Sequence, residues 1–205
     1  MSEILQNVRI STSRIFRLIK LDQKVFGEIR DDSNAKLVTS IAIIIASSLL
    51  AGLGSFLYWK ISGDESGVSG AFINTFVLGS LFMALLYIEG LLVIFVVLVQ
   101  IFRIPVDLHA LLCVGGYASF PLGLSLFMAI PLIYPLFSIL PLCLLFFFLT
   151  TGMQEVCQEK SAKVSFATLL GFGTTVVSLG IIAVLFSNPN APIGAGLFGL
   201  FLKLS

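Results

Sequence analysis

The sequence predicts an all-α integral membrane protein with five transmembrane helices, an N-terminus in the cytoplasm and a C-terminus outside. Composition is the first observation behind this prediction: 58% of the 205 residues are hydrophobic, 11% are charged, and the mean hydropathy is +1.07. A soluble domain has about 25% charged residues, so this chain has too few to cover a globular surface. The net charge of +1 gives no electrostatic support for nucleic acid binding.

The second observation is a set of five apolar runs. A helix needs roughly 20 apolar residues to cross the hydrocarbon core of a bilayer. We assign the predicted spans to 37–59, 71–102, 109–130, 132–152 and 164–186, which together form a five-helix domain over 37–186. The remaining residues, 187–205, include an apolar run too short to cross, and we expect this tail to lie at the interface or to dock on the bundle.

The third observation is the distribution of lysine and arginine among the connections. Ten of the twelve lie in the N-terminal segment and in the connections after the second and fourth spans, and two lie on the opposite side. Because positive residues are retained in the cytoplasm, this distribution predicts a cytoplasmic N-terminus. With an odd number of spans the C-terminus is then outside.

Residues 1–36 form a basic arm ahead of the first span. At helical periodicity its apolar residues gather on one side and five basic residues gather on the other: Arg9, Arg14, Arg17, Lys20 and Lys24. Such a helix is suited to the headgroup layer of an anionic inner leaflet, and we expect a break near Leu21 and Asp22, with Asp22 as a candidate N-cap. The alternative is a plain cytoplasmic lead-in whose charges only enforce topology.

Glu89 is the one charged residue within the second apolar run. A carboxylate at membrane depth costs a few kcal/mol on insertion scales, so we expect Glu89 to face the bundle interior or to be protonated. It is a candidate proton or cation site. The alternative is a protonated carboxyl that donates a hydrogen bond to a neighbouring helix.

The third run contains the segment CVGGYASFPLG, which combines small residues with a proline. Gly115, Ser119 and Gly123 recur every four residues and predict close packing against a small-residue face of the first span at Ser47, Ala51 and Ser55. We also expect Gly116, Tyr117 and Pro121 to contribute to the kink and the packing of the third span. Because Pro121 has no N–H, the Tyr117 carbonyl loses its helical partner and a kink is expected. A ligand cleft at this kink is the alternative to simple packing.

Catalytic and cofactor motifs are absent from the sequence. The single histidine, His109, shares a predicted helix face with Cys113, but a metal site usually needs three or four ligands. No hydrolase, metalloprotease, P-loop or dinucleotide pattern occurs. We therefore expect no enzymatic activity, no cofactor and no metal.

Four segments carry a resemblance to a known family. They are LDQKVFGEIRDD (21–32), LLCVGGYASFPL (111–122), IPLIYPL (130–136) and GMQEVCQEKSAKV (152–164). The chain resembles the Ypt-interacting protein (YIP) family of five-span membrane proteins, in its short prokaryotic form, from about residue 15 to 186. The resemblance implies a role in membrane trafficking or shaping. It implies a prokaryotic cytoplasmic membrane, or the Golgi and endoplasmic reticulum in a eukaryote.

The sequence departs from the eukaryotic members of that family in two respects. The long cytoplasmic N-terminal region is missing, and the Asp-Leu-Tyr-Gly-Pro motif is reduced to Asp107 and Leu108. Both departures weigh against contact with a GTPase.

Three functions are consistent with these features. The first is a non-enzymatic membrane organiser or adaptor, whose partners are the bilayer, anionic inner-leaflet lipids and other membrane proteins or a second copy. The second is a small transporter or channel that uses Glu89 and the kinked third helix. The third is lipid handling in an apolar groove between the third and fourth spans. The scarcity of intramembrane polar groups favours the first.

Overall fold

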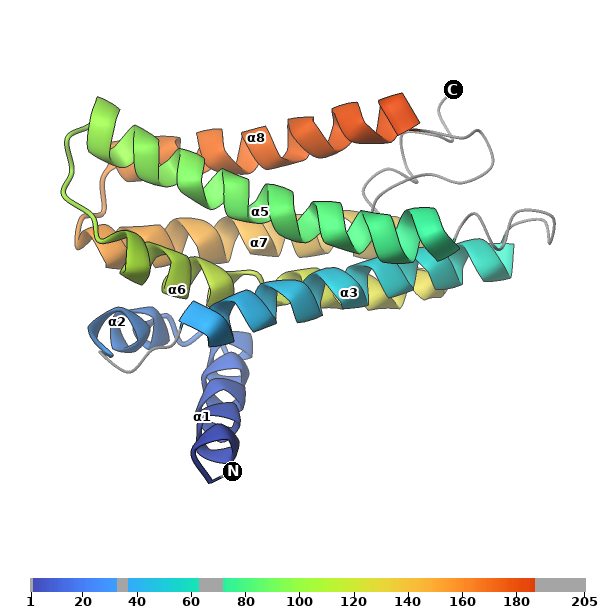
Figure 1. Ribbon diagram of the computed structural model, residues 1–205, viewed down its shortest axis with the longest axis horizontal. Coiled ribbons are helices and arrows are strands. Elements are labelled where there is room, and N and C mark those ends of the chain that lie inside the picture. The colour runs from blue at the N-terminus through green and yellow to red at the C-terminus, as the bar shows by residue number, and fades with distance from the viewer. Residues whose placement is uncertain (1, 33–36, 63–71, 187–205) are drawn as a thin grey trace.

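The chain is a bundle of long helices with a short helical arm at one end (Figure 1). The computed structural model describes residues 2–32, 37–62 and 72–186, and the tail predicted at 187–205 lies outside them. Within the described part every regular element is a helix. Five stretches are long and apolar enough to cross a membrane: Leu37–Ile61, Phe76–Ile101, Leu108–Ala129, Tyr134–Cys157 and Ala162–Ile181. The predicted number and order of spans is therefore confirmed, whereas their orientation stays a prediction.

The first span is helix α3 (Leu37–Ser62), and the second is a composite. Its central α5 (Gly79–Val96) is flanked by two π-helical segments, η2 (Phe72–Leu78) and η3 (Val97–Ile101). Wide turns of this kind accommodate an extra residue in a helix. The chain leaves η3 at Arg103, which has a left-handed backbone with φ 56°.

The third span changes helix type partway along its length. It begins as α6 (Leu108–Ala118) and continues as the 3₁₀ helix η4 (Phe120–Ala129). Asp107 caps α6 by accepting the N–H groups of His109 and Ala110. The fourth span is α7 (Tyr134–Cys157), whose end is closed by the left-handed Gln158, and the fifth is α8 (Ala162–Phe186).

Glycines set the closest helix contacts in the bundle. Gly90 of α5 and Gly171 of α8 lie so close that a Cβ on either would overlap the backbone of the other. Gly54 of α3 meets the backbone of η4 at Ser125 in the same way. Small residues permit this approach because no side chain holds the backbones apart. Figure 1 accordingly shows α5 and α8 running side by side.

The arm consists of α1 (Ser2–Ile19) and α2 (Lys24–Asp31). The predicted break is confirmed: Leu21 has a left-handed backbone with φ 61°, and the Asp22 N–H donates to the Arg17 carbonyl at 3.0 Å. This pattern is the Schellman termination of a helix, here with leucine where glycine is usual. In Figure 1, α1 runs across the direction of the span helices and its N-terminal part extends beyond the bundle.

Candidate functional site

The transition between α6 and η4 is the first part of the candidate site. Pro121 lies near the start of η4, and the Gly116 carbonyl accepts both the N–H of Ser119 at 3.2 Å and its hydroxyl at 2.7 Å. The Ser119 N–H is directed at the Tyr117 carbonyl as well. The expected kink therefore takes the form of a change from α to 3₁₀ helix, which absorbs the missing proline N–H.

The small-residue face of the third span packs on the first span, as predicted. The hydroxyls of Ser47 and Ser119 lie 3.1 Å apart, and Ser40 donates its hydroxyl to the Cys113 carbonyl at 3.2 Å. A Cβ at Gly116 would lie 2.5 Å from the Cβ of Ser40, so the absence of a side chain at Gly116 permits the close approach of α6 to α3.

The other two glycines of that segment face different neighbours. A Cβ at Gly115 would lie 2.6 Å from the Leu91 side chain of α5, whereas one at Gly123 would lie 3.2 Å from Leu50 of α3. The predicted stripe is thus divided between two partner helices. The four-residue spacing identified the small residues, but it did not identify which helix each one meets.

Two tyrosines connect the third span to its surroundings. Tyr87 of α5 is buried and donates its hydroxyl to the Gly115 carbonyl at 2.7 Å. Tyr117 is also buried and donates its hydroxyl to Ser11 of α1 at 2.9 Å. The aromatic side chain within the CVGGYASFPLG segment therefore joins the arm to the bundle.

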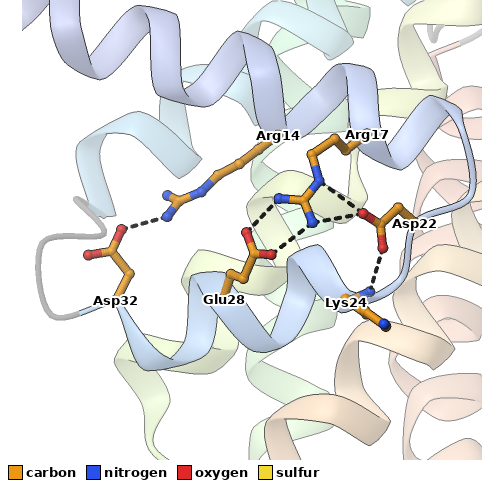
Figure 2. Close-up of polar contacts among 6 residues, drawn as sticks. All are labelled: Arg14, Arg17, Asp22, Lys24, Glu28 and Asp32. Atoms are coloured by element: carbon orange, nitrogen blue, oxygen red, sulfur yellow. Dashed lines mark hydrogen bonds and ion pairs between the residues drawn. The ribbon is translucent and has the colours of Figure 1, made fainter.

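Ion pairs hold α1 and α2 together (Figure 2). Arg14 contacts the Asp32 carboxylate at 2.6 Å, and Arg17 contacts both Asp22 and Glu28 at 2.7 Å. Hydrogen bonds from Arg17 lower the pKa of Asp22 and of Glu28, and the same bonds raise the pKa of the guanidinium. Asp22 also accepts the Lys24 N–H at 3.3 Å, but the N-cap of α2 is Gln23, so the prediction of Asp22 as the N-cap is wrong by one residue.

This network changes the interpretation of the basic face. Of the five residues predicted to face anionic lipid, Arg14 and Arg17 instead pair with carboxylates, and the Arg14 side chain is only 14% exposed. Arg9, Lys20 and Lys24 are exposed. A helical wheel treats the arm as one continuous helix, whereas the turn at Leu21 folds α2 back so that Glu28 and Asp32 face α1.

The apolar residues of α2 pack on protein. Val25, Phe26 and Ile29 are fully buried, and the Phe26 ring meets Phe148 of α7 edge to face with centroids 6.4 Å apart. Arg30 donates to the Glu155 carbonyl at the end of α7 at 2.7 Å. The arm is therefore fastened to the bundle by α2 as well as by Tyr117.

A cavity of about 440 Å³ lies where the arm meets the spans. Its walls come from four helices and one turn: Ile15 and Ile19 belong to α1, Leu21 to the turn after it, and further residues to α3, η4 and α7. All lining side chains are apolar except that of Ser47, whose hydroxyl is engaged with Ser119. The groove expected between the third and fourth spans is present, and α1 and α3 complete it.

Glu89 is exposed on α5, so the expectation that it faces the bundle interior is wrong. The residue after it, Gly90, is buried against α8 and turns Glu89 outward. Tyr117 and Pro121 are buried in the third span, whereas Glu89 is exposed on α5. The structure therefore does not bring Glu89 together with Tyr117 and Pro121, and the protonation of Glu89 stays a prediction.

The described residues contain no group of three or more histidine, cysteine, aspartate or glutamate side chains able to hold a metal ion. The predicted shared face of His109 and Cys113 is confirmed, with the thiol 3.8 Å from the imidazole Nε2. Two features of the structure had signals in the sequence that were not used. Asp107 directly before an apolar run indicates the cap of α6, and the acidic residues interleaved with basic ones at 22–32 indicate the ion pairs of the arm.

The chain matches no known family model, no curated protein and no solved structure. The resemblance to the YIP family therefore stays a prediction.

Proposed function

We propose that this protein is a non-enzymatic membrane organiser whose α1–α2 arm acts on one leaflet of the bilayer. The five apolar helices support residence in a membrane. Membership of the YIP family, with its link to membrane trafficking or shaping, belongs to the same proposal, as does placement of the arm on the cytoplasmic side.

The observation that carries the proposal is that the arm is fixed to the bundle across the direction of the spans (Figure 1). A helix on a free tether would transmit no orientation to the membrane domain. Here the ion pairs of Arg14 and Arg17, the buried face of α2 and the Tyr117–Ser11 hydrogen bond determine where α1 lies.

The outer surface of α1 is suited to the headgroup layer. Phe16 is 61% exposed and Ile10 is 41% exposed, and the basic Arg9 and Lys20 are exposed in the same arm. Apolar side chains enter the acyl boundary while cations attract anionic headgroups. A helix inserted in one leaflet only would expand that leaflet and favour curvature.

Position 16 provides a direct test of this placement. The variant Phe16→Trp, in a Trp59→Phe background, carries a single indole and is reconstituted into liposomes that contain lipids brominated on the acyl chain. We expect these lipids to quench the fluorescence of the indole at position 16, because the ring lies at the acyl boundary. Quenching by aqueous acrylamide with none by brominated lipid would place α1 in water and refute the proposal.

Vesicle diameter tests the organising activity itself. At equal protein-to-lipid ratio, we expect wild-type proteoliposomes imaged by electron cryomicroscopy to be smaller than those of Phe16→Asp. Ser13→Asp is the matched control, since it adds the same charge at an exposed position of the same helix. Equal diameters for the wild type and Phe16→Asp would contradict the proposal.

A further inference from the structure

We propose that the cavity beneath α1 holds one acyl chain of an anionic glycerophospholipid, whose phosphate is bound by Lys20. This inference rests on the proposed function, because both require α1 to lie at the lipid surface.

The size and lining of the cavity favour an apolar occupant. About 440 Å³ falls within the range of roughly 300–1,000 Å³ for sites that bind small molecules. Water needs two to four polar partners to fill a buried site, and the only lining hydroxyl, that of Ser47, already contacts Ser119. A hydrocarbon chain has no such requirement.

The position of the cavity favours a chain that comes from the bilayer. Three of its four lining helices are α3, η4 and α7, which belong to spans long and apolar enough to cross a membrane. The lining residues Ala46 and Leu50 are exposed, so the cavity is open along α3. An acyl chain could therefore enter sideways without leaving the hydrocarbon.

The charge at the rim favours an anionic headgroup. Lys20 lies between Ile19 and Leu21, two residues of the cavity wall, and its side chain is exposed. Within the described part of the chain Arg14 and Arg17 are bound to carboxylates, whereas Lys20 takes no part in those ion pairs. An exposed lysine whose two chain neighbours line an apolar cavity complements the phosphate of a lipid whose acyl chain occupies that cavity.

Photo-crosslinking in liposomes tests the site. The wild-type protein is reconstituted in phosphatidylcholine with a small fraction of phosphatidylglycerol that carries a diazirine in one acyl chain, and adducts are mapped by peptide mass spectrometry. We expect adducts on cavity residues such as Leu50, Leu144 and Phe148 in excess of those on exposed residues elsewhere on the same helices. A uniform distribution would overturn the proposal without any variant.

Two matched pairs of variants sharpen the test. Ala46→Trp fills the cavity and should remove the excess, whereas Ala42→Trp, one turn earlier at an exposed position of α3, should leave it. Lys20→Gln should reduce the phosphatidylglycerol adducts about fivefold, toward the level given by a phosphatidylcholine probe. Lys24→Gln, an exposed lysine that does not adjoin the lining, should leave them unchanged.

The remaining outcomes are informative about other occupants. A photoreactive amino acid at position 46 that attaches to a second copy, or to residues 187–205, in place of lipid would overturn the proposal. Loss of lipid adducts with continued quenching of the indole at position 16 by brominated lipid would defeat this inference alone. Loss of both signals would defeat the proposed function as well.

Discussion

Gly116 lies at a close contact between α3 and α6, so this position is sensitive to any added side chain. In the variant Gly116→Ala the new Cβ would lie 2.5 Å from the Cβ of Ser40 and 2.8 Å from its Cα and carbonyl oxygen. Ordinary contacts of a Cβ begin at 3.4 Å, so α3 and α6 must separate by about 1 Å. Backbone atoms cannot turn aside as a flexible side chain can.

The cost of this separation can be compared with a control in which no separation is needed. Overpacking of a well-packed interior lowers stability by about 1–3 kcal/mol. Replacement of glycine by alanine in a helix raises stability by about 0.8–1.0 kcal/mol through helix propensity. At Gly173 of α8 a new Cβ meets nothing within 4 Å, so Gly173→Ala gains the helix propensity of alanine without any cost of overpacking. The propensity change is common to both variants, and Gly116→Ala should be less stable than Gly173→Ala by about 1–3 kcal/mol.

Unfolding in mixed micelles measures this difference. Both variants and the wild type are titrated from dodecyl maltoside into sodium dodecyl sulfate and followed by far-UV circular dichroism. We expect Gly173→Ala to unfold at or above the wild-type midpoint and Gly116→Ala well below it. Equal midpoints for the two variants would refute the close approach of α3 and α6 at Gly116.

Three further predictions concern the arm and the second span. Arg17 lowers the pKa of Asp22 and Glu28, so their ion pairs stabilise the arm at pH values above the ordinary pKa values of 3.8 and 4.5. This stabilisation is lost as the pH falls through the lowered pKa values. The distance distribution between spin labels on exposed positions of α1 and α2 should therefore stay narrow from pH 5 to 8 and broaden in stronger acid. Tyr117→Phe removes one hydrogen bond to α1 and should lower stability by about 1 kcal/mol, with faster amide exchange in α1. Glu89→Leu should favour membrane insertion of the second span by more than about 2 kcal/mol in a glycosylation-mapping assay, because the carboxyl is exposed; a decrease would contradict a lipid-facing position.

The features that could be predicted from sequence depend on local properties of the chain. Span positions follow from run length and apolar composition, and both are local. The contact of Ser119 with Ser47 was also predictable, because small residues at helical spacing in two spans indicate a shared face. The break near Leu21 was predicted as well, although its left-handed leucine was not.

The orientation of Glu89 could not be predicted because α5 is apolar on every side. Exposed leucines occur at positions 81, 85 and 92, while Leu91 and Ile94 are fully buried. A periodicity argument needs a contrast between a polar face and an apolar face, and this helix has no polar face. The face is set by the glycine contact between α5 and α8, which joins residues far apart in the chain.

The ion pairs of the arm illustrate how one turn can reverse an electrostatic inference. On a single helix, Arg14 and Arg17 form part of a basic stripe that would attract anionic lipid. The turn at Leu21 brings Asp32 to Arg14 and Glu28 to Arg17, so two of the five cations are neutralised within the protein. Arg14 and Arg17 therefore fix α1 relative to the bundle. The exposed Arg9, Lys20 and Lys24 remain available to attract the anionic leaflet. Charge reversal at Arg17 should consequently loosen the arm, whereas charge removal at Lys20 should leave the arm in place and weaken only its contact with anionic lipid.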